Sequence, residues 1–329
     1  MQSSAPLSAE FDADAWKQAT LGDAMEKTFL LGVGAQKAGT TWIYRYLAEH
    51  PNCDFTLGKE YHALNWFFAP ATAISLQPTI PKIEALQEHL GILATLAKEP
   101  FSPTEMLLAG NLQKRVAFFQ SCLAFRETQQ LYLDHFTRIA AQDHERHVVG
   151  DITPAYSSLP HEAYRWLADG MAERGLRTKI LFVMRDPVDR VISQFRMMQK
   201  LKPKMFESRS LEAGLRALYR SSAVEVRTRY ENTLRTLDAA LAANESLCLF
   251  FEELFREDAL ARLCGHLGIA YEPAVFDVRV NESEGPAPDI DGDLQREIAR
   301  HYSSTYAFVA ERFGEASMRR LWRGYELLA

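Results

Sequence analysis

The segment TFLLGVGAQKAGTTWIYRYLAEH (28–50) holds the clearest structural signal in the chain. Its first part, TFLLGVG (28–34), is an apolar run that is typical of a buried strand. Its last part, TWIYRYLAEH (41–50), has the spacing of a helix and ends before Pro51. The part between them, GAQKAGTT (34–41), predicts a loop that binds an anion through backbone N–H groups and the positive end of the following helix.

Two glycines and one lysine give this loop its chemistry. Gly34 and Gly39 allow backbone conformations and close approaches that other residues would block. They keep the spacing of the GxxxxGK[ST] loop, which binds nucleoside triphosphates. Thr40 stands where that loop has lysine, however, and Lys37 projects from the middle of the loop instead. This departure weighs against an ATPase or a GTPase and suits a shorter 5′ group, such as a phosphosulfate. A turn that binds no ligand is the alternative.

The segment RDPVDRVISQF (185–195) predicts a second site for an anion. It follows the apolar run KILFVMR (179–185), so Arg185 emerges at the carboxyl edge of a parallel sheet, where ligands of open α/β folds bind. Arg185 offers a forked donor to phosphate oxygens, and Ser193 adds a hydroxyl two helical turns further on. Asp186 favours the start of the helix. Taken without the first loop, this turn would indicate only a structural helix start.

Further apolar runs at 147–151 and 246–254 extend a pattern in which strands alternate with helices. The pattern predicts an α/β fold of P-loop type with three layers, a central parallel sheet and helical insertions. Residues 1–27 are expected to form an N-terminal tail. Residues 28–329 are expected to form a single domain, with a helical insertion at about 70–145.

Composition excludes several classes of protein. The net charge of −6 leaves no broad cationic field, so nucleic acid is not expected as a partner. The four cysteines lack the spacing of a zinc site, and we expect no metal. With no run of about 20 apolar residues and no signal-peptide pattern, we expect a cytoplasmic protein without a membrane span. The oligomeric state cannot be read from the sequence.

Together, KAGTTWIYRYL (37–47) and RDPVDRVISQF (185–195) resemble the two nucleotide motifs of sulfotransferases that use 3′-phosphoadenosine 5′-phosphosulfate (PAPS). The resemblance implies transfer of a sulfonate group from PAPS, as co-substrate, to a hydroxyl or amine acceptor. It implies that the first motif holds the 5′-phosphosulfate and the second holds the 3′-phosphate. The implied donor-binding residues are Lys37, Ala38, Gly39, Thr40, Thr41, Trp42, Arg185 and Ser193.

A third segment, LGKEYHALNWFF (57–68), resembles the Lys-Glu-x-His-Phe-Phe segment of heparan-sulfate-type sulfotransferases. The resemblance implies that Glu60 takes the acceptor proton and that Lys59 and His62 line the site. A histidine fills this role in the cytosolic branch of the family, so His62 is the alternative base. Charge that develops on the bridging oxygen needs a cation, for which Lys37 is the candidate. This resemblance favours a carbohydrate as acceptor, and a small molecule such as an alcohol, or a lipid head group, fits as well.

The segment GDITPAYSSL (150–159) resembles the Glu-Lys-Thr-Pro-x-Tyr segment of the same branch, with two departures. Asp151 replaces the glutamate, and Ile152 replaces the lysine. Asp151 either orients a donor or acceptor group or is a strand-end acid that backbone N–H groups satisfy. Relatives often carry a basic Arg-Lys-Gly segment near the 3′-phosphate, whereas VNESEGPAP (280–288) has neither lysine nor arginine.

Two other functions stay open on the sequence alone. One is a P-loop nucleotide kinase or NTPase, which Thr40 in the lysine place disfavours. The other is a nucleotide-binding protein without catalysis, for which the absence of lysine at Ile152 leaves room.

Overall fold

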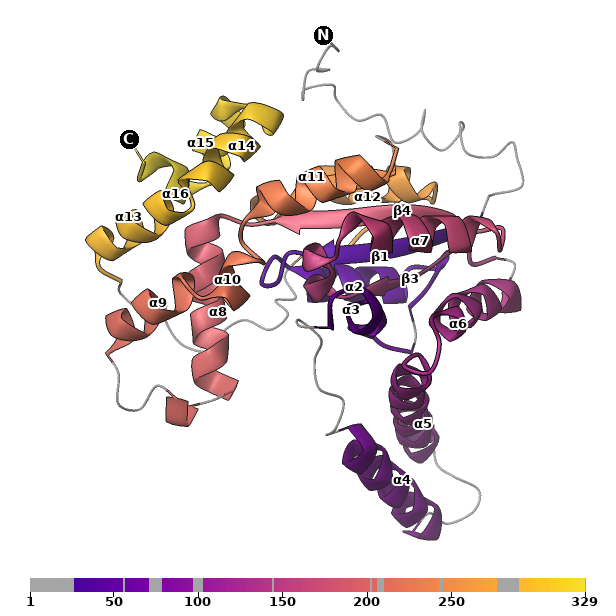
Figure 1. Cartoon of the computed structure of the whole chain (residues 1–329). Coiled ribbons are helices and arrows are strands. Elements are labelled where there is room, and N and C mark those ends of the chain that lie inside the picture. The colour runs from indigo at the N-terminus through magenta and orange to yellow at the C-terminus, as the bar shows by residue number, and fades with distance from the viewer. Residues whose placement is uncertain are drawn as a thin grey trace.

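A single parallel sheet forms the centre of the molecule (Figure 1). The computed structural model describes residues 27–55, 57–70, 79–96, 103–143, 145–201, 203–205, 210–242, 245–276 and 290–328. Within these residues the strand order is β2-β3-β1-β4-β5, and every neighbouring pair is parallel. The strands are β1 (Thr28–Gly34), β2 (Cys53–Asp54), β3 (Val148–Ile152), β4 (Arg177–Met184) and β5 (Ser246–Phe250).

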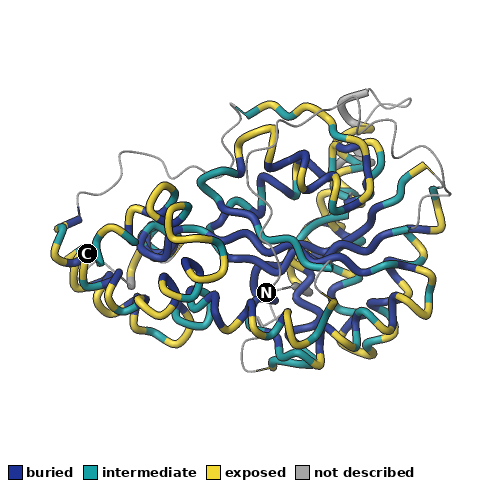
Figure 2. Tube along the Cα trace, turned by 90° about the horizontal axis from the view of Figure 1, so that it is seen from above, coloured by how far each residue is buried: buried dark blue, intermediate teal, exposed yellow. Residues whose placement is uncertain are grey.

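Apolar sequence explains why these strands lie in the interior. All seven residues of β1 and all five of β3 are buried, as expected for strands that are covered on both faces. Figure 2 shows the dark blue of the buried strands inside a shell of helices whose outer sides are exposed. The predicted α/β fold with a central parallel sheet is therefore confirmed. The short strand β2 was not predicted, because two residues carry no periodic pattern.

Helices pack against both faces of the sheet and make the outer layers (Figure 1). Helices α6, α7 and α11 contact one another in turn along one face, and α7 also contacts β4. Helix α2 packs with α12, where the Tyr46 hydroxyl lies 3.2 Å from Cys264 Sγ. The first helices are α2 (Thr40–Glu49), α3 (Ala63–Phe68), α4 (Thr79–Leu96), α5 (Pro103–Ala124), α6 (Gln129–Gln142), α7 (His161–Ala172) and α8 (Pro187–Leu201).

The later helices follow a similar pattern of short segments. They are α9 (Leu211–Tyr219), α10 (Ser222–Glu225), α11 (Tyr230–Ala240), α12 (Glu257–Leu267), α13 (Gly292–His301), α14 (Ser303–Phe313), α15 (Glu315–Leu321) and α16 (Arg323–Glu326). Three short 3₁₀ helices are also present among the described residues: η2 (Pro154–Ser158), η3 (Pro203–Met205) and η4 (Phe251–Glu253).

The region 70–145, predicted as one helical insertion, has two structural parts. Helices α4 and α5 pack on each other around a small core of Ile83, Leu86 and Val116, and Figure 1 shows them extending away from the sheet. Helix α6 instead contacts β3 and belongs to the layer that covers the sheet. The predicted tail at 1–27 lies outside the described residues except for Lys27. Its assignment, like that of the single domain, stays a prediction.

Candidate functional site

Lys37 and Arg185 lie next to each other at the carboxyl edge of the sheet. They follow β1 and β4, which are parallel neighbours, so the loops after both strands meet at the same edge. The Arg185 guanidinium donates through Nη1 to the carbonyl oxygen of Lys37, at 3.1 Å. The two motifs identified in the sequence therefore lie next to each other in the structure, although 148 residue positions separate Lys37 from Arg185.

The first loop leads directly into helix α2. Gly39 is the N-cap of this helix and has a φ of 81°, in the left-handed region that favours glycine. A Cβ atom at Gly39 would lie 2.5 Å from Leu254 Cδ2, so the loop has no room for a side chain there. Ala38 and Thr40 are buried on either side of Gly39. The N–H groups of the first helical turn are thus held at the loop, which is the arrangement that binds phosphate.

Trp42 lies in the first turn of α2 and is only 6% exposed. Its ring stacks on Phe276, with the ring centroids 5.9 Å apart, and meets Phe255 edge to face at 5.2 Å. These contacts place Trp42 in an aromatic cluster between α2 and the residues around α12. Its predicted part in donor binding stays a prediction.

Left-handed backbone conformations occur at all three predicted catalytic residues. Among non-glycine residues in the described part of the chain, positive φ angles are found at Lys37 (72°), Glu60 (66°) and His62 (56°). This conformation costs roughly 1–2 kcal/mol per residue and persists only where the surroundings enforce it. Such strain is concentrated at functional sites in proteins. Its coincidence with these residues supports the position of the site.

Lys59 connects the segment 57–68, which we call the acceptor segment after its predicted role, to the loop 34–41, which we call the donor loop for the same reason. Its ammonium Nζ donates to Thr41 Oγ1 at 2.9 Å and lies 3.0 Å from Glu60 Oε1. The backbone N–H of Glu60 donates to the carbonyl oxygen of Ile152 at 3.1 Å, which fixes the segment at the end of β3. The structure therefore brings Glu60 and Thr41 to one place from different parts of the chain.

The ionisation of Glu60 is set by its neighbours. Burial opposes ionisation, but His62 and Lys59 outweigh it and lower the pKa of Glu60 to about 2. The carboxylate is consequently charged at neutral pH, with 44% of its side chain exposed. His62 Nε2 lies 3.8 Å from Glu60 Oε2, which is an electrostatic contact and too long for a hydrogen bond. His62 Nδ1 is buried without a hydrogen-bond partner among the described residues.

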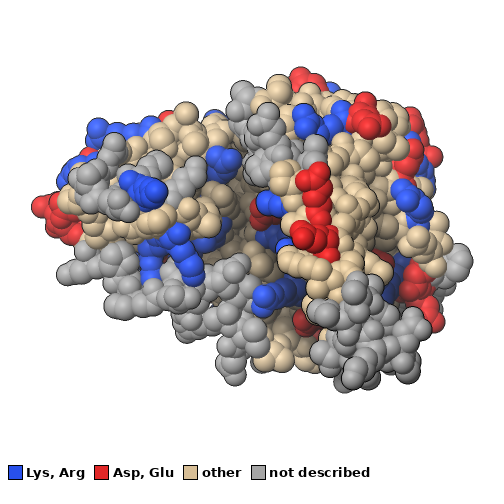
Figure 3. All heavy atoms as spheres, turned by 90° about the horizontal axis from the view of Figure 1, so that it is seen from below, with Lys and Arg blue, Asp and Glu red and all other residues tan. Residues whose placement is uncertain are grey.

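Positive charge gathers around Lys37. Burial lowers the pKa of the Lys37 ammonium, and three neighbouring cations lower it further: Arg185, Arg196 and Lys59. Figure 3 shows both Lys and Arg and Asp and Glu side chains along the hollow that divides this face of the molecule. The cluster of cations around Lys37 suits a ligand with more than one negative charge. Arg196 was not singled out from the sequence, although it follows Ser193 by one helical turn in α8.

Asp151 and Ile152 are both directed into the interior. Asp151 has no exposed surface, and its carboxylate accepts hydrogen bonds from the hydroxyls of Thr153 (2.6 Å), Tyr156 (2.9 Å) and Tyr132 (3.1 Å). These hydroxyl partners differ from the backbone N–H groups expected in one of the two predictions. Ile152 is buried beside Gly32, where a Cβ atom would lie 2.9 Å from Ile152 Cγ1. The position of the family lysine is therefore part of the core here.

Comparison with known families adds to this geometry. Residues 30–273 match the sulfotransferase family, and this range includes the donor loop, the acceptor segment and Arg185. The chain belongs to the sulfotransferase family. The family supports sulfonate transfer as the reaction of this sulfotransferase. No curated protein sequence matches it.

Several solved structures are similar to this sulfotransferase. A sulfotransferase from Alicyclobacillus acidocaldarius is 18% identical, with 87% of this chain and 95% of that chain covered and a TM-score of 0.48. The sulfotransferase domain of the Synechococcus PCC 7002 olefin synthase is also 18% identical, with 77% of each chain covered and a TM-score of 0.42. The sulfotransferase domain of the curacin biosynthetic pathway has a TM-score of 0.39 at 18% identity, with 75% and 76% covered.

The sulfotransferase holds Arg185 from several sides. The guanidinium lies over the ring of Phe251, 4.3 Å from its centroid. The carbonyl oxygen of Arg185 accepts a hydrogen bond from the Tyr230 hydroxyl at 2.8 Å, and the N–H of Asp186 donates to Glu252 Oε1 at 2.9 Å. These contacts fix both the side chain and the backbone of the turn. A fixed arginine loses less conformational freedom when it binds an anion.

The Asp186 carboxylate connects the turn that carries Arg185 to helices α14 and α16. Its Oδ1 accepts from the N–H of Val188 at 2.9 Å, which caps α8 as the sequence predicts. The same oxygen accepts from the Tyr306 hydroxyl, and Oδ2 accepts from the N–H of Gly324, both at 2.6 Å. Helices α14 and α16 therefore support the turn that carries Arg185. No local pattern in the sequence indicates these contacts.

Two observations on the described residues concern metal sites and membrane-spanning helices. No group of three or more His, Cys, Asp or Glu side chains comes together there in a way that could hold a metal ion. None of the helices in this part of the chain has the length and apolar character needed to cross a membrane.

Proposed function

We propose that this sulfotransferase uses PAPS as the donor and transfers its sulfonate group to a hydroxyl or amine of a carbohydrate or a small molecule. The contact between Arg185 and Lys37 carries the proposal, because it joins a loop suited to a 5′-phosphosulfate to an arginine suited to a 3′-phosphate. The 5′ group is assigned to Lys37, Ala38, Gly39, Thr40, Thr41 and Trp42, and the 3′-phosphate to Arg185 and Ser193.

In the proposed reaction, the acceptor oxygen or nitrogen attacks sulfur while the bond from sulfur to the bridging phosphate oxygen breaks. The products are the sulfonated acceptor and 3′-phosphoadenosine 5′-phosphate (PAP). Lys37 stabilises the negative charge that develops on the leaving oxygen, because its ammonium lies in the partly buried loop. The acceptor proton passes to a base in the segment 57–68.

We assign this base to Glu60, with His62 as the alternative. The low pKa of Glu60 makes it a weak base as long as Lys59 lies beside it. Lys59 also contacts Thr41 in the donor loop. Donor oxygens at that loop draw the Lys59 ammonium toward themselves, which raises the pKa of Glu60 and strengthens it as a base when the donor is bound.

An acceptor screen with radiolabelled PAPS, preceded by calorimetric titration of PAP, tests the proposed function. Binding of PAP and transfer of label to an acceptor are the expected results. Binding of ATP with hydrolysis, and no binding of PAP, would overturn the proposal in favour of a P-loop kinase or NTPase. Binding of PAP with no transfer to any carbohydrate, phenol, alcohol or amine would instead indicate a nucleotide-binding protein without catalysis.

A further inference from the structure

Arg190 is a buried arginine whose charge has no counter-ion among the described residues. The side chain has no exposed surface, and its Nε and Nη1 groups make no hydrogen bond to any of those residues. Nη2 donates to the carbonyl oxygen of Val224 at 3.3 Å, a long contact. A buried charge without an opposite charge is costly, so a protein retains one where something else compensates it.

Arg227 lies beside Arg190. Its Nη1 donates to the carbonyl oxygen of Ala223 at 2.6 Å, one residue before the carbonyl that accepts from Arg190. Burial lowers the pKa of the Arg227 guanidinium, and no described carboxylate offsets this effect. Arg190 is influenced by the charges of both Arg227 and Arg185. Adjacent carbonyl oxygens therefore hold Arg190 and Arg227, and the charge of Arg185 also acts on Arg190.

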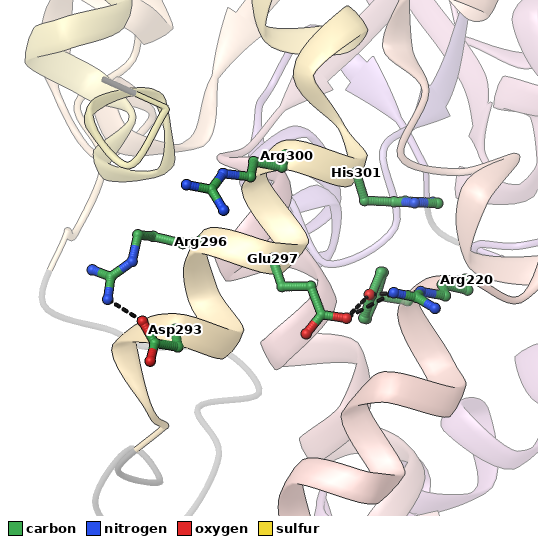
Figure 4. Close-up of a pocket in the computed structure, with 7 residues that line it drawn as sticks. Arg220, Asp293, Arg296, Glu297, Arg300 and His301 are labelled. Carbon is green, nitrogen blue, oxygen red and sulfur yellow. Dashed lines mark hydrogen bonds and ion pairs between the residues drawn. The ribbon is translucent and has the colours of Figure 1, made fainter.

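The arginines in a neighbouring pocket are arranged differently. This pocket of about 550 Å³ lies between α9 and α13 (Figure 4). Glu297 accepts from Arg216 and from Arg220 there, and Asp293 pairs with Arg296. These two carboxylates already pair with three of the nearby arginines. A dianionic ligand gains more beside Arg190 and Arg227, where no such carboxylate is present among the described residues.

The position of the three arginines suits a phosphate group as the ligand. Arg190 and Ser193 are one turn apart on the same side of α8, and Arg185 stands just before that helix. Arg227 lies two residues after the end of α10, and its charge acts on Arg190. The segment VNESEGPAP (280–288) offers no lysine or arginine for the same purpose. A phosphate group at Arg185 and Ser193 therefore has Arg190 on α8 and Arg227 beside α10 as further cations, in addition to Lys37 and Arg196.

We propose that Arg227 binds the 3′-phosphate of the donor directly, and that Arg190 acts behind it as a positioning residue through its charge. This inference rests on the proposed function and adds specificity for nucleotides that carry a 3′-phosphate. The ligand is a dianionic phosphate monoester on the ribose. Arg190 has no surface with which to touch it, so its effect is electrostatic and is transmitted through Arg227 and Arg185.

The test compares PAP with AMP, which lacks the 3′-phosphate, by calorimetry. Arg227→Ala is expected to weaken PAP binding by about 10- to 100-fold, as for a lost charge-assisted hydrogen bond, and to leave AMP binding unchanged. Arg227→Lys should retain part of the affinity for PAP. Arg296→Ala removes the same charge from the neighbouring pocket and should leave PAP binding unchanged.

The other possible results of these titrations distinguish failure of this inference from failure of the proposed function. Unchanged PAP binding by Arg227→Ala, or an equal loss for PAP and AMP, overturns the inference and leaves the proposed function intact. No binding of PAP by the unaltered protein overturns both. Inorganic phosphate titrated alone should bind far more weakly than PAP, and an equal affinity would assign the arginines to free phosphate instead.

Arg190→Met separates the electrostatic role of Arg190 from a structural one. Methionine keeps most of the volume and removes the uncompensated charge, so the melting temperature of the ligand-free protein should rise or stay the same. The increase in melting temperature on adding PAP should become smaller than in the unaltered protein. A ligand-free protein that is less stable, with an unchanged increase on adding PAP, would show that Arg190 serves the fold alone.

Discussion

Lys59 and Glu60 form an ion pair at 3.0 Å, and the same ammonium donates to Thr41 in the donor loop at 2.9 Å. One side chain thus contacts both the candidate base and the loop assigned to the leaving group. The chemical state of Glu60 consequently depends on how strongly Lys59 is held by Thr41 and by whatever ligand occupies the loop. This relationship gives the candidate site a measurable pH dependence.

Lys59→Gln is expected to shift the acidic limb of the pH–rate profile to higher pH. Glu60 works as a base only when deprotonated, so the rate falls as pH falls through its pKa. That pKa is about 2 with Lys59 and His62 present, and it rises when Lys59 loses its charge because only His62 then opposes the effect of burial. A profile of kcat/KM, which reports the free enzyme, between about pH 4 and 8 measures the shift. An acidic limb at the same pH in both proteins would contradict this assignment.

Glu60→Gln is expected to reduce kcat by about 10²- to 10⁴-fold, the usual contribution of a positioned base. Affinity for PAP should stay unchanged, because Glu60 is assigned to the acceptor proton. The measurements are single-turnover transfer and calorimetry with PAP. His62→Ala is the matched variant. If Glu60→Gln stays active and His62→Ala is inactive, His62 is the base and the segment 57–68 has been misassigned.

Lys37→Ala is expected to lower both kcat and donor affinity, in contrast to Glu60→Gln. The ammonium is assigned to the phosphosulfate in the ground state and to the leaving oxygen in the transition state, so its loss affects both. Transfer assays at several PAPS concentrations separate the two effects. Lys204→Ala, which removes an exposed lysine from η3, is the control and should change neither quantity. Retention of full kcat by Lys37→Ala would rule out the proposed role.

Gly39→Ala is expected to destabilise the protein more than Gly268→Ala. Both glycines have left-handed φ angles, 81° and 70°, so each alanine carries a similar backbone cost of about 1–2 kcal/mol. Only Gly39 lacks room, because its added Cβ would meet Leu254 Cδ2 at 2.5 Å, whereas at Gly268 the new atom would have no described neighbour within 4 Å. Overpacking adds about 1–3 kcal/mol. Urea unfolding measures both changes, and equal losses would show that the loop adjusts to a side chain.

Stability is expected to fall as pH rises through about 7, because of Glu252. Burial raises the pKa of Glu252 to about 7, so the folded state binds a proton that the unfolded state releases near its ordinary value of 4.5. Between about pH 4.5 and 7 the unfolded state binds fewer protons than the folded state, so the free energy of unfolding decreases as pH increases. Melting temperatures between about pH 5 and 8 measure the effect. Glu252→Gln should flatten the curve, and an unchanged slope would assign it to another group.

The sequence allowed the sheet and its functional edge to be predicted, because both depend on local patterns. The apolar runs that became β1 and β4 each precede a helix, and parallel strands place the residues after them at one edge. Strand β2 has two residues and no such pattern. The proximity of Arg196 to Lys37 was also missed. Its only signal is the spacing of three residues from Ser193.

Contacts between distant residues could not be predicted in the same way. The Tyr132 hydroxyl in α6 meets Asp151 across 19 residues, and Gly324 meets Asp186 across 138 residues. Hydrogen bonds of this kind depend on the finished packing. The uncompensated charge of Arg190 has the same origin, since burial of a single side chain within a helix leaves no mark in the sequence.

The bonds from Asp186 to Tyr306 and Gly324 set a limit on how this molecule can be divided. The range that matches the sulfotransferase family ends at residue 273, before both of these partners. A fragment cut at that boundary would keep every residue assigned to the donor and yet leave the buried Asp186 carboxylate without the Tyr306 hydroxyl and the Gly324 amide. Recombination with a relative would face the same requirement. The C-terminal helices and the Arg185 turn have to be exchanged as one unit, whatever their separation along the gene.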